Sequence, residues 1–268
     1  MAHADWKIQG SAGEAMHGTT NESDSTPTGI ILIAHGFKGY KDYGMFPWLA
    51  HQLAKCGKIV HRFNFSHSGM TAGDGPFERP DLFERDTWNR QVEDLAILTK
   101  ELNRDGMPMT LLGHSRGGVS CLLAVGRGVA EVDGVITLSA PATCNPMTPE
   151  MQQTLLKQGF IESPSSRTEQ KLHVGRSFLQ EQLDDPENHD LLALVAGIRS
   201  PILVIHGETD PTVSVESAVA ITEAGQDTTL VRIQDGDHVY NTPNPFPESS
   251  TPSEQLAAVQ DAIQSWLA

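Results

Sequence analysis

Cysteine is scarce in this chain. Its 268 residues include three cysteines, Cys56, Cys121 and Cys144, which are widely separated. Three scattered cysteines are too few for a disulfide framework, and no C-x-x-C pair indicates a zinc or redox site. The H-E-x-x-H pattern of many zinc enzymes is also missing. The sequence therefore predicts neither a disulfide-stabilised fold nor a metal site.

Long apolar runs and basic charge are lacking as well. No stretch of about 20 apolar residues could cross a bilayer, and residues 1–10 lack the basic flank and apolar run of a signal peptide. Lys and Arg number 19 against 34 Asp and Glu, so the formal net charge is −15. Nucleic acids and anionic membrane surfaces repel such a chain. We therefore expect a cytoplasmic protein that acts on a small molecule and binds neither nucleic acid nor membranes.

Short apolar runs alternate with helical patterns along the chain. Nearly continuous apolar runs are typical of strands buried on both faces of a parallel sheet. Apolar residues spaced three and four apart predict helices between them, the last with Ser253 as its N-cap. The alternation predicts an α/β fold, with a mainly parallel sheet covered by helices on both faces. The expected strands are 29–36, 58–65, 109–113, 134–139, 201–206 and 228–233, and the expected helices are 45–57, 88–102, 117–128 and 252–268.

Two segments depart from this rhythm. Residues 11–29 are polar and rich in Gly, Ser and Thr, which favours a loop with at most a weak hairpin near 12–19. Residues 141–200 are longer than a simple crossover requires. We interpret them as a small helical, cap-like insertion over the carboxyl edge of the sheet. The prediction is one domain, 1–268, with this insertion.

The segment GHSRGG, residues 113–118, follows one predicted strand and opens a helix. A serine on so sharp a turn is held in strained backbone geometry, with its hydroxyl raised above the strand ends. Side chains at positions 113 and 117 would clash with neighbouring backbone, which explains the two glycines. The helix N-terminus also favours developing negative charge. The pattern predicts Ser115 as a catalytic nucleophile.

A serine hydroxyl requires a base, and the base requires an acid that orients it. Asp210 follows the strand at 201–206, and His238 follows the strand at 228–233. Both stand at the edge where α/β sheets bind ligands, in the chain order expected for this turn. Glu208 is an alternative acid. Asp235 and Asp237 lie close to His238 in sequence, but we expect them to shape its turn.

We expect structural roles for several other histidines. His206 is expected to be a packed core histidine, and His114 to point away from Ser115. The histidines that show no ligand spacing, and for which surface or core roles are expected, are His51, His61, His173 and His189.

Acyl transfer also requires backbone N–H groups aimed at the developing oxyanion. One such donor is the residue after the nucleophile, here Arg116. The other comes from the glycine-containing loop after an early strand. In that loop Gly36 allows the turn, and the N–H of Phe37 is the candidate donor.

Four segments in chain order, HGFKG, GHSRGG, HGETD and GDHVY, resemble serine hydrolases of the α/β-hydrolase superfamily. Residues 35–69 further resemble the group that contains dienelactone hydrolases, cinnamoyl and feruloyl esterases, and prolyl oligopeptidase catalytic domains. The resemblance implies an α/β-hydrolase fold, an ester-cleaving Ser115–Asp210–His238 triad, and no cofactor. Dienelactone hydrolases typically use a cysteine nucleophile, so Ser115 favours the esterase branch. The opening hairpin typical of the fold is short and polar here, which predicts a reduced sheet.

The leading hypothesis is a carboxylic-ester hydrolase that acts on small to medium acyl groups through an acyl-enzyme intermediate. A peptidase or amidase that acts on short peptides would use the same triad. A non-catalytic binding protein on a hydrolase fold is a third reading, although an intact triad argues against it. Candidate pocket residues, chosen because ligand sites are mostly apolar, are residues of the 141–200 insertion together with Phe37, Tyr40, Phe65, Met70 and Trp88.

Overall fold

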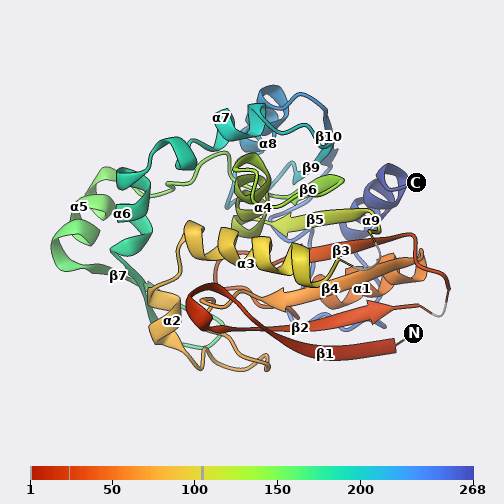
Figure 1. Ribbon diagram of the computed structural model, residues 1–268, viewed down its shortest axis with the longest axis horizontal. Helices are drawn as coiled ribbons and strands as arrows, with labels where there is room; N and C mark the ends of the chain where they lie inside the picture. The colour runs from red at the N-terminus through yellow and green to blue at the C-terminus, as the bar shows by residue number, and fades with distance from the viewer. Residues whose placement is uncertain (1, 24, 104–105) are drawn as a thin grey trace.

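A computed structural model describes residues 2–23, 25–103 and 106–268. Its centre is a twisted eight-stranded sheet with the spatial order β1-β2-β4-β3-β5-β6-β9-β10 (Figure 1). The strands from β4 to β10 in this order run parallel, and the β1–β2 hairpin joins antiparallel at one edge. Their bounds are β1 Ala2–Gln9, β2 Ala15–Glu22, β3 Gly29–Ala34, β4 Lys58–Asn64, β5 Met109–His114, β6 Gly134–Leu138, β9 Ile202–Gly207 and β10 Thr228–Ile233.

The six predicted strands are confirmed as β3, β4, β5, β6, β9 and β10. Every residue of β3, β5, β6 and β9 is buried, as their continuous apolar sequences require. β10 is an edge strand, and it is only partly buried. The mainly parallel sheet that the alternating pattern predicted is therefore present.

The prediction of a loop over residues 11–29 is wrong for residues 15–22, which form β2. β1 and β2 form a hairpin whose strands pair over eight residues each, and β2 continues the sheet onto β4. The predicted reduction of the sheet is therefore also wrong. The hydrophobic pattern did not indicate β2, because some of its buried side chains are polar and hydrogen-bonded. The Asn21 Oδ1 accepts a hydrogen bond from Arg62 at 2.6 Å, and the Thr19 hydroxyl donates one to Asp5 at 2.6 Å. Alternation of apolar and polar residues is lost where hydrogen bonds satisfy buried polar groups.

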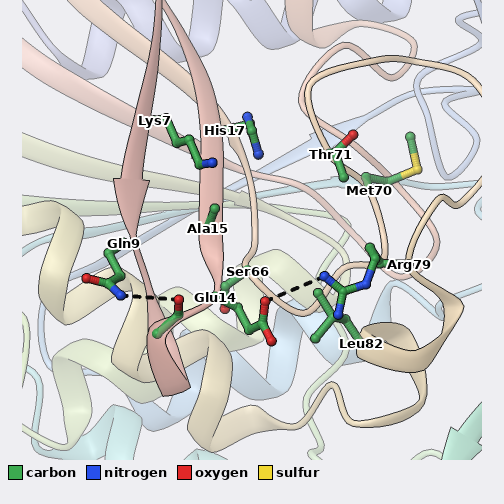
Figure 2. A pocket seen from close by; sticks show the side chains of 11 residues that line it. Lys7, Gln9, Glu14, Ala15, His17, Ser66, Met70, Thr71, Arg79 and Leu82 are labelled. Carbon is green, nitrogen blue, oxygen red and sulfur yellow. Dashed lines mark hydrogen bonds and ion pairs between the residues drawn. The ribbon is translucent and has the colours of Figure 1, made fainter.

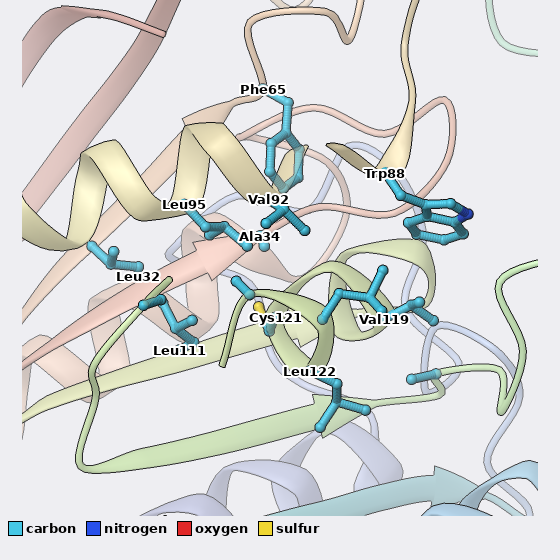
Figure 3. Close-up of a cluster of buried hydrophobic side chains, with 14 of the residues drawn as sticks. Leu32, Ala34, Phe65, Trp88, Val92, Leu95, Leu111, Val119, Cys121 and Leu122 are labelled. Carbon is cyan, nitrogen blue, oxygen red and sulfur yellow. The ribbon is translucent and has the colours of Figure 1, made fainter. Parts of the chain in front are cut away.

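Helices cover both faces of the sheet and enclose two apolar cores. Strand side chains alternate between the faces: Leu32 of β3 joins one core, and Ile33 joins the other. Figure 3 shows the first core, where Leu32 and Leu111 meet side chains such as Leu95 and Leu122 from two helices. The covering helices are α1 Phe46–Lys55, α3 Trp88–Glu101, α4 Arg116–Gly126, α7 Leu191–Ala196, α8 Glu216–Ala224 and α9 Glu254–Trp266. The four predicted helices correspond to α1, α3, α4 and α9.

The N-cap prediction for α9 is confirmed. Ser253 accepts a hydrogen bond from the N–H of Leu256 at 3.0 Å. Such a cap satisfies one of the backbone donors that a helix start leaves free.

The insertion at 141–200 is not only helical. It contains an antiparallel hairpin that forms a separate two-stranded sheet, and Pro164 is the last residue of its first strand. In Figure 1 the insertion lies beyond the carboxyl ends of the central strands. That residues 1–268 form one domain stays a prediction. The remaining elements are α2 Pro80–Glu84, α5 Pro149–Gln158, α6 Ser177–Asp184, β7 Phe160–Pro164, β8 Lys171–Gly175, and the short 3₁₀ helices η1 Ser11–Gly13 and η2 Glu187–His189.

Candidate active site

Ser115 lies on the sharp turn between β5 and α4. Its backbone has φ 52° and ψ −121°, a conformation that residues with a side chain rarely adopt. A Cβ at position 113 would collide with the backbone of Gly117, and one at position 117 would collide with the carbonyl oxygen of Ala34. The predicted steric need for glycine at 113 and 117 is therefore confirmed.

Asp210 and His238 meet across neighbouring loops that follow β9 and β10. His238 Nδ1 lies 2.8 Å from Asp210 Oδ2, and the Asp210 side chain is fully buried. The other carboxylate oxygen, Oδ1, accepts the N–H groups of Thr212 at 2.8 Å and Val213 at 2.9 Å. A carboxylate held in this way fixes the Nδ1–H tautomer of His238 and leaves Nε2 free to accept a proton.

His206 is a second histidine against the same carboxylate. It is fully buried, as predicted, but it does more than pack. Its Nε2 lies 2.9 Å from the carbonyl oxygen of Val213 and 3.3 Å from Asp210 Oδ2. Burial by itself would raise the pKa of Asp210, but hydrogen bonds from His206, His238 and the Val213 N–H outweigh it and lower that pKa. Asp210 is therefore a carboxylate throughout the neutral range.

The competing acids lie elsewhere. Glu208 is exposed to solvent, whereas Asp210 is the residue that contacts His238. Asp237 shapes the turn, as expected, because its Oδ1 accepts the N–H groups of Val239 and Asn241.

His114, which we expected to point away from Ser115, contacts the other candidate catalytic residue, His238. Its Nε2–H donates to the carbonyl oxygen of His238 at 2.8 Å, and the two ring centroids are 4.8 Å apart. Burial, and then the neighbouring His238, lower the pKa of His114 to about 3. His114 is thus a neutral ring that supports the His238 loop. Its position beside Ser115 in sequence was the signal that could have suggested this contact.

The loop after β3 passes directly over Ser115. A Cβ built on Gly36 would lie 3.1 Å from the Ser115 Cβ, so glycine permits the close approach. Among the described residues, the Phe37 N–H has no hydrogen-bond partner. Arg116 is the first residue of α4, and the N–H groups of a first helical turn lack partners within the helix. Neither of the two N–H groups is thus engaged by a partner in the parts of the chain that the structure describes, and their role as oxyanion donors stays a prediction.

Two cavities open at Ser115. The smaller, of about 180 Å³, is lined by Ser115 and His238 together with polar side chains. The larger, of about 420 Å³, is lined by Ser115, Arg116 and mainly apolar side chains. Within the described residues no hydrogen bond joins Ser115 to His238, and such catalytic contacts often tighten only when substrate binds.

The predicted pocket residues divide into two groups. Phe37 lines both cavities, and Trp88 lines the larger. Phe65 lies in the apolar core with no exposed surface, and Tyr40 is buried nearby. Met70 lines a different cavity. None of these three lines a cavity at Ser115, and an apolar sequence does not distinguish a pocket wall from a buried side chain.

The insertion at 141–200, also expected to contribute to the pocket, supplies walls of the larger cavity. The larger cavity is lined from there by Met147, Met151, Ile161, Val174 and Phe178. The Arg116 guanidinium lies 4.9 Å from the ring centroids of Trp88 and Phe178, and 3.2 Å from Asp86. Burial raises the pKa of Asp86 to about 7, although Arg116 opposes this.

A further cavity, of about 600 Å³, does not include Ser115. It lies between the β1–β2 hairpin and residues 66–82, and Figure 2 shows its polar walls, including the pair Arg79–Glu14 at 3.7 Å. The ring nitrogens of His3 and His51 and a Glu248 carboxylate oxygen also lie within 4.8 Å of one another. None of these groups lines the cavities at Ser115, so they form no part of the candidate active site.

A family model described as serine aminopeptidase, S33, matches residues 25–188, more than half of the chain. The chain belongs to this family. This S33 hydrolase has the α/β-hydrolase fold, as the four sequence segments suggested. None of the helices within the described residues combines the length and apolar character that a membrane span requires.

Curated relatives of the S33 hydrolase include two monoglyceride lipases. Those of Rattus norvegicus and Mus musculus are 28% and 26% identical over 123 and 121 residues. The matches cover 45% of this chain but only 38% of either relative's length.

Solved structures with the same fold cover nearly the whole chain. Ferulic-acid-bound Est1E from Butyrivibrio proteoclasticus has a TM-score of 0.72 at 19% identity, and covers 96% of this chain and 95% of its own. An esterase domain from Rhodothermus marinus scores 0.67 at 21% identity, with coverage of 99% and 98%. A dienelactone hydrolase from Anabaena variabilis scores 0.64 at 17% identity, with coverage of 100% and 98%. These TM-scores establish that the fold is shared, and at identities this low the likeness extends to the fold alone.

Proposed function

We propose that this hydrolase cleaves carboxylic esters of small to medium acyl groups through a serine acyl-enzyme intermediate. The observation that carries the proposal is the convergence of Ser115 and His238 on one cavity, with His238 Nδ1 2.8 Å from the buried Asp210. The monoglyceride lipases and esterases among its relatives and structural neighbours support an ester as the substrate class.

In the proposed reaction the Ser115 Oγ attacks the ester carbonyl carbon, while His238 Nε2 accepts the hydroxyl proton. The tetrahedral oxyanion accepts hydrogen bonds from the N–H groups of Phe37 and Arg116. His238 then returns the proton to the leaving alcohol, and Ser115 carries the acyl group. Water, deprotonated by His238, attacks the acyl-enzyme and releases the acid. Asp210 stabilises the imidazolium at each step.

A peptidase that removes N-terminal residues is the second candidate, because the family description names that activity. The charge of the site disfavours it. A free α-ammonium group is bound best by a carboxylate, and no Asp or Glu of the described residues lines either cavity at Ser115.

The size of the larger cavity supports the preference for modest acyl groups. Its volume of about 420 Å³ is at the lower end of ligand pockets. We also propose that the enzyme acts in the cytoplasm on a small-molecule ester, without nucleic acid or membrane partners. The three free thiols Cys56, Cys121 and Cys144 and the net charge of −15 support this.

The test compares p-nitrophenyl esters of increasing acyl length with aminoacyl p-nitroanilides. We expect kcat/KM to be highest for acyl chains of about two to eight carbons, and to be lost in Ser115→Ala. Ser250→Ala, in the loop before α9, is the matched control and should keep wild-type activity. Efficient anilide cleavage with poor ester cleavage would favour the peptidase. Full ester activity in Ser115→Ala would exclude Ser115 as nucleophile.

A further inference from the structure

The two cavities at Ser115 have different chemical roles. In the proposed reaction His238 must protonate the leaving oxygen, so the leaving alcohol has to lie on the His238 side of the scissile bond. His238 lines the smaller cavity and does not line the larger one. The alcohol therefore occupies the smaller cavity, of about 180 Å³, and the acyl group occupies the larger, mainly apolar one.

The smaller cavity is cationic in a strongly acidic protein. The chain carries a net charge of −15, yet the ionised side chains that line this cavity are Lys38 and Arg167, and no Asp or Glu of the described residues joins them. Lys38 comes from the loop that follows β3, and Arg167 comes from the β7–β8 hairpin of the insertion. Two distant segments thus bring positive charge to the same small space.

Neither cation is neutralised. Within the described part of the chain, neither Lys38 nor Arg167 forms an ion pair with a carboxylate within 4.0 Å. Lys38 Nζ donates to the carbonyl oxygen of Pro164 at 2.7 Å, and Arg167 Nη1 donates to those of Asp74 and Gly75 at 2.9 and 2.7 Å. Carbonyl oxygens orient a cation but leave its charge unbalanced. Burial also lowers the pKa of Lys38, as expected for a cation without a counter-ion.

Arg167 is held rigidly in this position. Its guanidinium lies over the rings of Tyr40 and Phe77, 4.6 and 5.2 Å from their centroids. Its Nε is buried and has no hydrogen-bond partner among the described residues. A guanidinium already fixed by stacking loses little conformational entropy when it binds an anion.

We propose that the leaving group is a small alcohol that carries an anionic group, a carboxylate or a phosphate, bound by Lys38 and Arg167. This inference rests on the proposed ester hydrolysis, and it names the substrate class. The anion would supply the countercharge that the protein does not. Its binding would also hold the ester oxygen near His238, since the same cavity contains both.

The test uses three butanoate esters of alcohols of similar size: 3-hydroxypropanoate, its neutral amide 3-hydroxypropanamide, and 2-hydroxyethyl phosphate. At low ionic strength we expect wild-type kcat/KM to be about tenfold higher for at least one anionic ester than for the neutral one, since two partly exposed charge pairs form. The preference should shrink as salt is added. Whether the carboxylate or the phosphate ester reacts faster identifies the anion.

Variants then assign the preference to residues. Lys38→Met and Arg167→Met should each lower the ratio of anionic to neutral kcat/KM roughly threefold, mainly through KM. Lys38→Arg should retain most of it. Lys171→Met is the matched control, because it removes one positive charge from β8 without lining the cavity, and it should leave the ratio unchanged.

The outcomes separate this inference from the proposed function. If p-nitrophenyl butanoate is hydrolysed in a Ser115-dependent manner but the wild-type ratio is one or less, the anionic leaving group is wrong and the esterase stands. A ratio that both Met variants leave unchanged also overturns the inference. If no ester is cleaved in a Ser115-dependent manner, the proposed function falls and this inference falls with it.

Discussion

Replacing Asp210 by asparagine tests the candidate site most sharply, because the substitution changes charge and donor pattern but hardly alters shape. Asp210 Oδ1 accepts the N–H groups of Thr212 and Val213, and an asparagine oxygen can continue to do so. The asparagine NH₂ group then replaces Oδ2. It meets His238 Nδ1 at 2.8 Å and His206 Nε2 at 3.3 Å, both of which are donors in wild type.

Two donors cannot bond to each other, so His238 must present Nδ1 as an acceptor. Its proton then moves to Nε2, the nitrogen that has to accept the Ser115 proton. We expect kcat to fall on the order of 10³- to 10⁴-fold, as the wrong tautomer does in Ser-His-Asp enzymes. At about 1.4 kcal/mol for each factor of ten, this is a loss of about 4 to 6 kcal/mol of transition-state stabilisation.

The assay is hydrolysis of p-nitrophenyl butanoate, with circular dichroism as a check that the variant is folded. Glu208→Gln is the matched control, since it makes the same chemical change two residues away on an exposed side chain. It should keep kcat within about twofold and the free energy of unfolding within about 0.5 kcal/mol. If Asp210→Asn remains within tenfold of wild type while Glu208→Gln is crippled, the acid has been assigned wrongly.

Three further predictions concern stability. Ser115→Gly should be inactive, yet its free energy of unfolding should be about 1 kcal/mol higher than that of Ser115→Ala. Glycine relieves the strain at φ 52°, whereas alanine retains it. Equal denaturation midpoints and slopes in urea for the two variants would contradict this. Gly117→Ala should destabilise the fold by about 2 to 3 kcal/mol, because its Cβ meets the Ala34 carbonyl oxygen, and thermal melting measures the loss. The third concerns Asp86, whose pKa is raised from 3.8 to about 7. Between these two pH values the folded state binds more protons than the unfolded chain. The contribution of Asp86 to stability therefore declines as the pH rises from about 4 to 7. Asp86→Asn should make the free energy of unfolding less dependent on pH over that range, and an unchanged slope would show that the pKa is not raised.

Local features of the sequence were sufficient to predict the scaffold and the three candidate catalytic residues. An uninterrupted apolar run such as GIILIA indicates a strand that is buried on both faces. Successive side chains of a strand point to opposite faces of the sheet, so both faces are apolar here. Gly113 avoids a collision with the backbone of Gly117 inside the same turn, and Asp210 and His238 each follow an apolar strand by a few residues. Each of these inferences depends on neighbours a few residues away, which is why the linear sequence contains them.

Only the tertiary structure decided what depends on distant segments. The β2 strand was missed because Asn21 is satisfied by Arg62, a partner on another strand. The contact of His114 with the His238 carbonyl depends on how separate loops pack. Lys38 and Arg167 share one cavity because the insertion folds back over the loop after β3. Residues far apart in sequence become neighbours only when the whole chain packs, so no local pattern records the charge and shape of the cavities at Ser115.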